Sequence, residues 1–328
     1  MQRLEIRSTL RNYEVLIENG LLDHLDSHLD PAVFYVVIAD DGIPSIYVEK
    51  VATAVPNHEL IRFPAGESNK NLAQFSRIVD IMIRQNVKRD ACVIALGGGL
   101  TGDLAGFVAS VYLRGIRLIH IPTTLIAQID SCIGGKVGID TLAGKNMIGS
   151  FYPPEKVLID PETLRTLPER HRMNGMAEMI KYGMIADKDL FFRIKNEDVF
   201  SSIDYFIHRS LSIKKRFIEA DERDIGIRQS LNFGHTIGHA LEAYFRYEDL
   251  LHGEAVAIGM ATIVSDPSVR AELITCLNKY HLPTENPVPM DKLKEFINRD
   301  KKSRKDLLKI VEVSEIGTSV IVKSQFRF

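Results

Sequence analysis

The sequence predicts an α/β half with a Rossmann-like parallel sheet over residues 1–160, followed by a mostly α-helical half over residues 161–328. In the first half, short β-branched apolar runs alternate with segments of helical spacing, a pattern typical of a buried parallel sheet. From Leu164 onward helical spacing dominates. Pro153-Pro154 and Pro161 mark the change, so we place the domain boundary near residue 160. We expect the active site in a cleft between the two halves.

Individual elements follow from the local patterns. Buried strands are expected at residues 33–39, 91–96, 118–121 and 156–159, and an amphipathic helix at 68–85. In the second half, helices are expected near residues 172–185, 201–222, 230–245 and 252–264. The tail contains two β-type runs, 307–313 and 318–323, which predict a small hairpin.

Composition places the chain among ordinary globular proteins, with 45% hydrophobic and 26% charged residues among 328. Lys plus Arg is 41 and Asp plus Glu is 43, which gives a net charge of −2. This balance argues against a nucleic-acid or membrane partner. The 3 cysteines form no CxxC pair, and the N-terminal residues lack the apolar core of a signal peptide. We therefore expect a cytoplasmic protein.

The first candidate site is the glycine-rich turn Gly97-Gly98-Gly99, which follows a predicted strand and precedes a helix. Glycines there let a backbone approach a pyrophosphate, and the helix N-terminus offers free N–H groups. Asp40 ends another strand, where a carboxylate can bind ribose hydroxyls. Glu67 and Lys70 lie just before a helix. Each of these features alone is equally typical of a turn or a helix cap.

The second candidate site contains two lysines in glycine-rich segments, Lys136 after Gly134-Gly135 and Lys145 after Gly144. Glycine adds no packing, so lysines in this context favour a loop that holds phosphate rather than a solvated surface. Asp130 precedes them and is a candidate partner for a lysine or a substrate hydroxyl.

The third candidate site is a polar stripe on a helix expected at residues 228–243. Steps of four, three, four and three place its members on one face. A solvated face is the alternative, but histidine and asparagine are poor helix formers for such a surface. The members are Arg228, Asn232, His235, His239 and Glu242.

The same region predicts a metal site, because histidines four residues apart are typical zinc ligands. Glu178 and Lys181 lie one turn apart on an otherwise apolar helix, where a buried carboxylate requires a cation. Spacing leaves open which three of the candidates His235, His239, His252, Glu178 and Glu242 bind the ion. Six other histidines are interpreted as surface or capping residues: His24, His28, His58, His171, His208 and His281.

Over residues 60 to 260 the chain resembles the 3-dehydroquinate synthase family of sugar phosphate cyclases. Several motifs occur in the family's order, which is more specific than any one of them. They include GGGLTGDLAGFVASVYLRG, IPTTLIAQIDSCIGGKVGID, GKNMIGSFYPPEKVLID, TLRTLPERHRMNGMAEMIKYG, DERDIGIRQSLNFGHTIGHALE and LHGEAVAIGM.

The resemblance implies specific roles for residues that match the family's motifs. It implies a zinc or cobalt ion bound by Glu178, His235 and His252, with His239 facing the substrate. Substrate-binding residues would be Asp130, Lys136, Asn146, Lys181, Lys214, Arg228, Asn232, His239 and one of Lys301 and Lys302. NAD would contact Asp40, Glu67, Lys70, Gly99, Leu100, Thr101, Gly102, Asp103, Thr123, Thr124, Lys136, Lys145, Thr163, Leu164, Arg165 and Thr166. Arg114 would reach the phosphate site of a neighbouring subunit, which implies a homodimer.

The activity that the resemblance implies is conversion of 3-deoxy-arabino-heptulosonate 7-phosphate to 3-dehydroquinate and phosphate, a step of the shikimate pathway. The family oxidises a hydroxyl with NAD, eliminates phosphate, reduces the ketone again and closes the carbocycle by aldol addition. Another cyclase, of the 2-deoxy-scyllo-inosose or valiolone type, is the nearest alternative. A metal-dependent polyol dehydrogenase and a catalytically silent binding protein are the others.

The chain also departs from the family pattern. After Met260 the family has a longer helical pair, whereas here Ser265-Asp266-Pro267-Ser268 makes a short join. The segment around Lys301 is more basic than usual, and Gly42 replaces an asparagine that the family often has near the ribose.

Overall fold

The computed structural model describes residues 1–299 and 308–324, and the chain divides into two compact units, Met1–Leu167 and Pro168–Phe328. The residues just before the division belong to the first unit, where Thr166 donates a hydrogen bond to the Tyr47 hydroxyl at 3.0 Å. The roles predicted for the halves, NAD binding in the first and metal and substrate binding in the second, stay predictions. So does the cleft.

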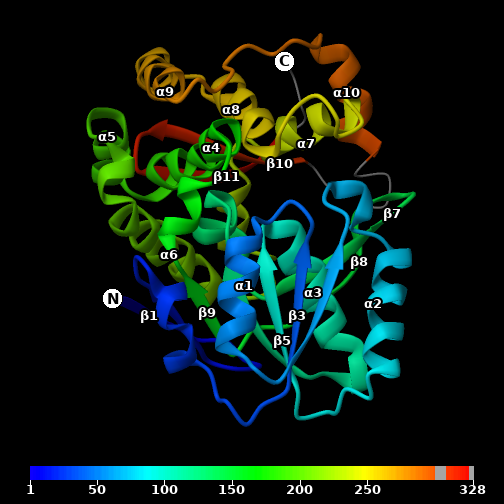
Figure 1. The fold of residues 1–328 in the computed structure, drawn as a ribbon. Helices are drawn as coiled ribbons and strands as arrows, with labels where there is room; N and C mark the ends of the chain where they lie inside the picture. The colour runs from blue at the N-terminus through cyan, green and yellow to red at the C-terminus, as the bar shows by residue number, and fades with distance from the viewer. Residues whose placement is uncertain (300–307, 325–328) are drawn as a thin grey trace. The chain divides into compact units, whose positions relative to one another are not determined.

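The first unit is built on a seven-stranded sheet with the order β1-β2-β9-β6-β5-β3-β4 (Figure 1). All neighbours are parallel except the antiparallel pair β1 and β2. The predicted α/β class with a parallel sheet is therefore confirmed. The strands are β1 (Gln2–Ile6), β2 (Tyr13–Ile17), β3 (Tyr35–Asp40), β4 (His58–Phe63), β5 (Cys92–Gly97), β6 (Arg117–Pro122) and β9 (Lys156–Ile159).

Helices cover both faces of this sheet. On one face α1 (Ser45–Ala54) and the short helix η1 (Leu21–His28) pack against one set of alternating strand residues. On the other face α2 (Leu72–Arg84) and α3 (Gly99–Val111) pack against the other set. Because successive strand residues point to opposite faces, a strand such as β3, apolar from Tyr35 to Ala39, supplies both cores.

The order of the strands creates a switch point between β3 and β5. The chain runs from β3 to β4 on one side and from β5 to β6 on the other, and the helices α1 and α3 that follow them lie on opposite faces. In open α/β sheets, ligands bind at the carboxyl ends of the strands at such a point. Asp40 and Gly97 occupy these two strand ends.

An antiparallel hairpin, β7 (Lys136–Thr141) and β8 (Gly144–Phe151), stands apart from the large sheet. The prediction of flexible glycine-rich loops at Lys136 and Lys145 is therefore wrong, because both lysines lie on strands. Glycine is a poor strand former, so the glycines of this segment weaken the strand pattern in its sequence.

Over its described residues, 168–299 and 308–324, the second unit is helical apart from one hairpin (Figure 1). Its central helix α4 buries every residue from Asn174 to Ile185, because other elements surround it. The helices are α4 (Glu169–Ala186), α5 (Lys188–Asn196), α6 (Ile203–Ala220), α7 (His235–Tyr244), α8 (His252–Ile263), α9 (Pro267–Lys279) and α10 (Met290–Arg299). Short helices are η2 (Glu67–Asn69), η3 (Tyr112–Arg114), η4 (Ala127–Ser131) and η5 (Pro161–Arg165) in the first unit, and η6 (Val199–Ser202) and η7 (Ile227–Asn232) in the second.

The expected single helix over residues 228–243 is wrong. The short helix η7 ends at Asn232, and α7 begins at His235 after Gly234, whose φ is +78°. A Cβ on Gly234 would lie 2.7 Å from the Val256 carbonyl oxygen and 2.6 Å from Met260 Cγ. The close approach of α8 therefore requires a left-handed glycine, which breaks the helix.

The remaining joins follow from caps and turns. Asp266 accepts hydrogen bonds from the backbone N–H groups of Ser268 and Val269, and Pro267 is the first residue of α9. Proline is compatible with that position, so the short join after α8 is a regular helix start. The predicted tail hairpin is confirmed as β10 (Leu308–Glu315) and β11 (Thr318–Ser324). No helix in the described residues has the length and apolar character needed to cross a membrane.

Candidate active site and metal centre

Glu178 is a buried carboxylate on the central helix α4, with 1% of its side chain exposed. Its nearest cation is Lys181, one helical turn later and equally buried, which forms an ion pair with Oε2. Burial alone raises a carboxyl pKa, but Lys181, His235 and His252 outweigh it and hold the pKa of Glu178 well below its usual value. The carboxylate is therefore ionised inside the unit.

His235 approaches Glu178 from the first position of α7. Its Nε2 lies 3.4 Å from Glu178 Oε1, and its Nδ1 lies 3.1 Å from the backbone oxygen of Phe233. The carbonyl can only accept, so Nδ1 carries the proton and Nε2 presents a lone pair. Burial lowers the pKa of His235 to about 3, which keeps the ring neutral.

His252 approaches the same carboxylate from the first position of α8. Its Nε2 lies 3.3 Å from Glu178 Oε1, and its Nδ1 lies 3.3 Å from Glu242 Oε2. Burial lowers its pKa, but the neighbouring carboxylates of Glu178 and Glu242 prevail and raise the pKa to about 10. A divalent cation bound here would take the place of the proton on Nε2.

These three side chains fit a metal ion. One ligand atom from each of Glu178, His235 and His252 lies within 4.8 Å of the others. Within the described residues, neither oxygen of Glu178 has a hydrogen-bond partner of good geometry, although both are buried. Both imidazoles present Nε2 while an oxygen acceptor holds Nδ1, an arrangement typical of metal-ligating histidines. The geometry suits a zinc-type ion with two nitrogen ligands and one oxygen ligand.

A second set of possible ligands overlaps the first. His239, Glu242 and His252 also offer atoms within 4.8 Å of one another. Here Glu242 would have to give up the Nδ1 of His252, and His239 is exposed on α7. The orientation of His252 therefore favours Glu178 and assigns Glu242 to positioning the ring. Spacing had left Glu242 among the candidate ligands.

Asn174 is a positioning residue that the sequence analysis missed. Its side-chain oxygen accepts a hydrogen bond of 2.6 Å from the backbone of Gly253, directly after His252. A Cβ on Gly253 would lie 2.0 Å from the Asn174 backbone oxygen, so only glycine fits. This contact fixes the start of α8 against α4. The signal in the sequence is a polar asparagine one helical turn before Glu178, on an otherwise apolar segment.

Three buried cations surround this part of the unit. Lys181, Lys214 and Arg228 are 2%, 6% and 4% exposed, and they lie on the mutually packed elements α4, α6 and η7. Arg228 Nη1 donates to the backbone oxygen of Glu222 at 2.8 Å, which holds the guanidinium in place. Lys181 is paired with Glu178, so Lys214 and Arg228 are the two groups here that the resemblance implies for an anionic substrate. Of the other predicted substrate residues, Asn232 and His239 are exposed.

In the first unit, the candidate NAD residues gather at the switch point. Asp40 accepts hydrogen bonds from the Thr101 hydroxyl at 2.7 Å and from the Gly42 backbone at 2.9 Å. Gly99 begins α3, and the N-cap Gly98 has no side chain to cap the first turn. The N–H groups of Gly99, Leu100 and Thr101 are therefore suited to bind a pyrophosphate.

Lys70 connects this region to the hairpin. Its buried ammonium donates to Asp103 Oδ2 at 2.5 Å and to Asn146 Oδ1 at 2.6 Å. Burial opposes its charge, but Asp103 and Glu67 outweigh this and raise the pKa of Lys70. Asp140 accepts from the backbone of Asn146 at 2.7 Å. Asp103, predicted to bind NAD, and Asn146, predicted to bind substrate, thus both accept a hydrogen bond from Lys70.

The other predicted residues of the first unit divide into exposed and internal groups. Lys136 is exposed, Lys145 lies 3.5 Å from Glu67, and Asp130 is half-buried on η4. Arg114 has a left-handed φ of +67° at the end of η3. Gly102, Thr123 and Thr124 lie near the glycine turn, where the Thr123 backbone donates to the Gly97 oxygen at 2.9 Å.

The predicted turn 163–166 is largely internal. The Thr163 hydroxyl bonds Asp160 O at 2.8 Å and accepts from Gln128 at 2.9 Å, and Leu164 is buried. Thr166 donates to Tyr47, and Arg165 pairs with Glu162 at 3.1 Å. These bonds shape the turn. Lys301 and Lys302 lie outside the described residues.

Comparison with known proteins identifies the family. A model described as 3-dehydroquinate synthase N-terminal matches residues 60–174, and one described as 3-dehydroquinate synthase C-terminal matches residues 175–303. The chain belongs to the 3-dehydroquinate synthase family. A 3-dehydroquinate synthase of Streptococcus suis is 40% identical over 330 residues, covering 94% of this chain and 93% of the relative.

Solved structures of other cyclases share the fold. A 2-deoxy-scyllo-inosose synthase complexed with carbaglucose-6-phosphate, NAD+ and Co2+ has a TM-score of 0.88 at 26% identity, covering 98% of this chain and 94% of that one. A 2-epi-5-epi-valiolone synthase from Streptomyces hygroscopicus with NAD+ and Zn2+ has a TM-score of 0.87 at 28% identity, covering 96% and 93%. The resemblance and the two-part fold predicted from the sequence are thus confirmed.

Proposed function

We propose that this chain is an NAD- and divalent-metal-dependent carbon–oxygen lyase that converts 3-deoxy-arabino-heptulosonate 7-phosphate to 3-dehydroquinate and phosphate. Membership of the 3-dehydroquinate synthase family supports the reaction. The observation that carries the chemistry is the convergence of Glu178, His235 and His252 on one point, with Nδ1 of both rings held by oxygen.

The cofactors are NAD and zinc or cobalt. Related cyclase structures hold NAD+ with Co2+ or Zn2+, and the described residues offer a fitting set for each group. When bound, NAD+ supplies a hydride acceptor, and the metal supplies Lewis acidity at a substrate hydroxyl. Glu178, His235 and His252 would hold the metal, and the switch-point residues around Asp40 and Gly99 would hold the nucleotide.

The substrate residues of the second unit provide charge and position. Arg228 suits the carboxylate of the sugar acid because its planar guanidinium can bond both oxygens. Lys214, buried nearby on α6, adds positive charge, and Lys181 neutralises part of the charge on Glu178. Asn232 and His239 would bind phosphate oxygens. These groups act by orientation and fixed electrostatics.

The substrate residues of the first unit are Lys136, Asn146 and Asp130. Lys136 would bind phosphate as a point charge. Lys70 binds the side-chain oxygen of Asn146, and Asp140 binds its backbone N–H. Together these two bonds fix the orientation of the side-chain amide. Asp130 would bind a substrate hydroxyl or position a lysine.

We also propose a cytoplasmic homodimer with Arg114 contributing to the partner's phosphate site. The left-handed backbone at Leu113 and Arg114, with φ of +48° and +67°, supports a functional constraint there. Non-glycine residues adopt such angles at a cost of about 1–3 kcal/mol. The 3 cysteines are free and buried, which is compatible with a reducing compartment.

The decisive assay incubates the metal-loaded protein with NAD+ and either one of three sugar phosphates or a polyol, while phosphate release, product identity and NADH are measured. We expect turnover of the heptulosonate phosphate to 3-dehydroquinate, one phosphate per product and no net NADH. Turnover of glucose 6-phosphate or sedoheptulose 7-phosphate instead would identify another cyclase. Accumulation of NADH with a polyol would identify a dehydrogenase.

A further inference from the structure

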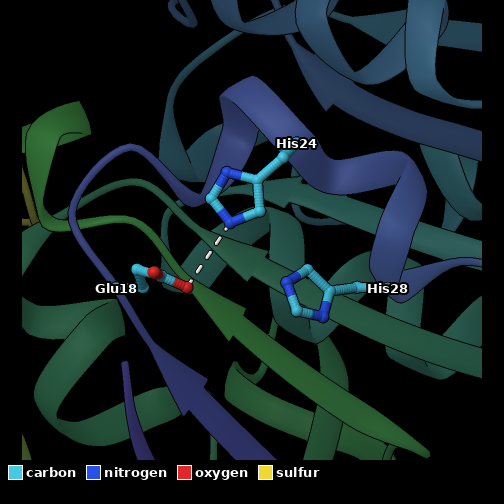
Figure 2. Close-up of side chains that lie close together, drawn as sticks. All are labelled: Glu18, His24 and His28. Atoms are coloured by element: carbon cyan, nitrogen blue, oxygen red, sulfur yellow. Dashed lines mark hydrogen bonds and ion pairs between the residues drawn. The ribbon is translucent and has the colours of Figure 1, made fainter.

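A second group of potential ligands lies in the first unit, distant in sequence from the candidate active-site ligands. Glu18 follows β2 directly, and His24 and His28 lie on η1. Figure 2 shows the three side chains directed toward a common space, with one nitrogen of the His28 ring facing the other two. From the sequence alone, both histidines are interpreted as surface or capping residues.

The backbone that carries these residues is fixed by the core. Leu21, Leu22 and Leu25 bury one face of η1, so His24 and His28 stand on the other face. The Glu18 N–H donates to the Ile159 oxygen at 3.1 Å, which ties it to β9. Preorganised ligands of this kind lose little conformational entropy on binding.

Asp160 and a kink at His24 also determine the position and shape of η1. Asp160 accepts from the backbone of Gly20 at 2.9 Å and of Leu22 at 3.0 Å, which anchors the start of η1. His24 has non-helical angles, φ −136° and ψ 33°. The tighter winding of a 3-10 helix would separate residues four apart, so this kink is what lets the two imidazoles share a side.

The atoms are close enough to share an ion. One ligand atom from each residue lies within 4.8 Å of the others, and His24 Nε2 is 3.4 Å from Glu18 Oε2. Nε2 of His28 is buried and, within the described residues, has no hydrogen-bond partner. A buried polar atom without a partner costs free energy, so this nitrogen indicates a missing ligand.

We propose that Glu18, His24 and His28 form a second binding site for a divalent transition-metal ion of the zinc class. Two imidazoles and one carboxylate match zinc, nickel or copper, whereas magnesium and calcium prefer oxygen ligands. Such an ion joins η1 to the end of β2 and so stabilises the first unit. Lys156, which donates to the His28 backbone oxygen at 3.0 Å, is a nearby positive charge that weakens this site.

The test counts bound zinc per chain by equilibrium dialysis and elemental analysis, after metal has been removed with a chelator. We expect two zinc ions per wild-type chain, one in His28→Gln, one in His235→Ala/His252→Ala and none in the triple variant. His171→Gln, which changes an exposed histidine elsewhere, should keep two. Because His28 and the active-site ligands are changed in separate variants, the zinc count of each variant reports on one site independently of the other.

A second measurement covers variants that fold poorly. In the His235→Ala/His252→Ala background, saturating zinc should raise the melting temperature by about 5 °C. Adding Glu18→Gln or His24→Gln, both of which alter partly exposed side chains, should reduce zinc affinity at least tenfold. The proposal is wrong if this background binds no zinc. It is also wrong if Glu18→Gln, His24→Gln and His28→Gln, each added singly to this background, all leave its zinc binding unchanged.

Discussion

At the scale of single residues, the histidines near Glu178 differ in how closely each ring approaches the carboxylate. His235 and His252 each have an oxygen at Nδ1 and direct Nε2 toward Glu178, whereas His239 is exposed and lies 5.3 Å, ring to ring, from His235. The three rings are close together, so proximity alone does not distinguish ligand from substrate residue. The approach of Nε2 to Glu178 Oε1, at 3.4 Å for His235 and 3.3 Å for His252, supports these two as the ligands.

This distinction predicts opposite behaviour for two alanine variants. His235→Ala removes one of three proposed ligands, so bound active-site zinc and turnover should both fall at least a hundredfold. His239→Ala should keep full metal content and lose turnover, because its ring would bind substrate. Metal content and kcat measured on the same samples check this. An active His235→Ala enzyme with full metal would contradict the ligand assignment, and metal loss in His239→Ala would favour the overlapping set.

A buried histidine in the sheet predicts a pH effect on stability. His120 on β6 is 6% exposed, and burial lowers its pKa from 6.5 to about 4. The unfolded chain therefore binds a proton more readily between these values, so the free energy of unfolding falls as pH drops from 6.5 toward 4. Between pH 7 and 4.5 this residue should account for a loss of about 2 kcal/mol.

The variant His120→Leu isolates this contribution because leucine cannot titrate. Denaturant unfolding at the two pH values should show a smaller pH-dependent loss in the variant, by about that amount. Equal losses in the variant and the wild type would contradict the assignment to His120.

The sequence could supply the candidate ligands but not the choice among them. Spacing along one helix places His235 and His239 four residues apart, but Glu178 and His252 come from other helices. Which atoms meet depends on how α4, α7 and α8 pack, and on glycines such as Gly253 that permit the close contact. The family resemblance, unlike spacing, did indicate Glu178, His235 and His252.

At the scale of elements, the break between η7 and α7 sets the position of His235. Gly234 has a φ of +78° and lies against α8, where a Cβ would meet Val256 O at 2.7 Å. Gly234→Ala should lower the free energy of unfolding by about 3 kcal/mol and reduce zinc affinity, because it strains the backbone next to a ligand.

A matched control for this variant is Gly144→Ala. Its Cβ would meet nothing nearer than Met147 Cγ at 3.7 Å, an ordinary contact. Its stability should change by less than about 1 kcal/mol. Thermal and denaturant unfolding of both variants check the pair, and a Gly234→Ala protein as stable as the control would contradict the packing argument.

Element prediction succeeded where one periodicity dominated and failed where glycine interrupted it. The apolar strands β3, β5, β6 and β9 and the helices α2, α4, α6 and α8 were all predicted. The stripe from Arg228 to Glu242 fits helical spacing, yet a backbone contact at Gly234 divides it. The β7–β8 hairpin was missed because its glycines weaken the strand signal.

At the scale of the whole molecule, alternating strands and helices were enough to predict the parallel sheet and the helical second half. The division after Leu167 lies a few residues beyond the boundary expected near residue 160, because Thr163 and Thr166 anchor the turn before it to partners far away in sequence. Such contacts are invisible to composition. The expected subunit arrangement rests on the resemblance and on the left-handed backbone at Arg114.

The proposed homodimer predicts that two inactive variants can restore activity. Arg114→Ala and Arg228→Ala should each lose turnover, and in a mixed dimer one of the two sites would then be intact if Arg114 acts across subunits. Equal amounts, unfolded and refolded together, should recover about a quarter of wild-type activity. No recovery, with hybrids shown to form, would place Arg114 in its own subunit's site.

The most direct test of the central claim is anomalous scattering at the zinc edge from crystals of the zinc-loaded protein. We predict a peak at about 2.0–2.2 Å from one oxygen of Glu178 and from Nε2 of His235 and of His252. A peak bound by His239 and Glu242, without Glu178, would contradict the account, as would zinc-loaded, active crystals with no peak at this position.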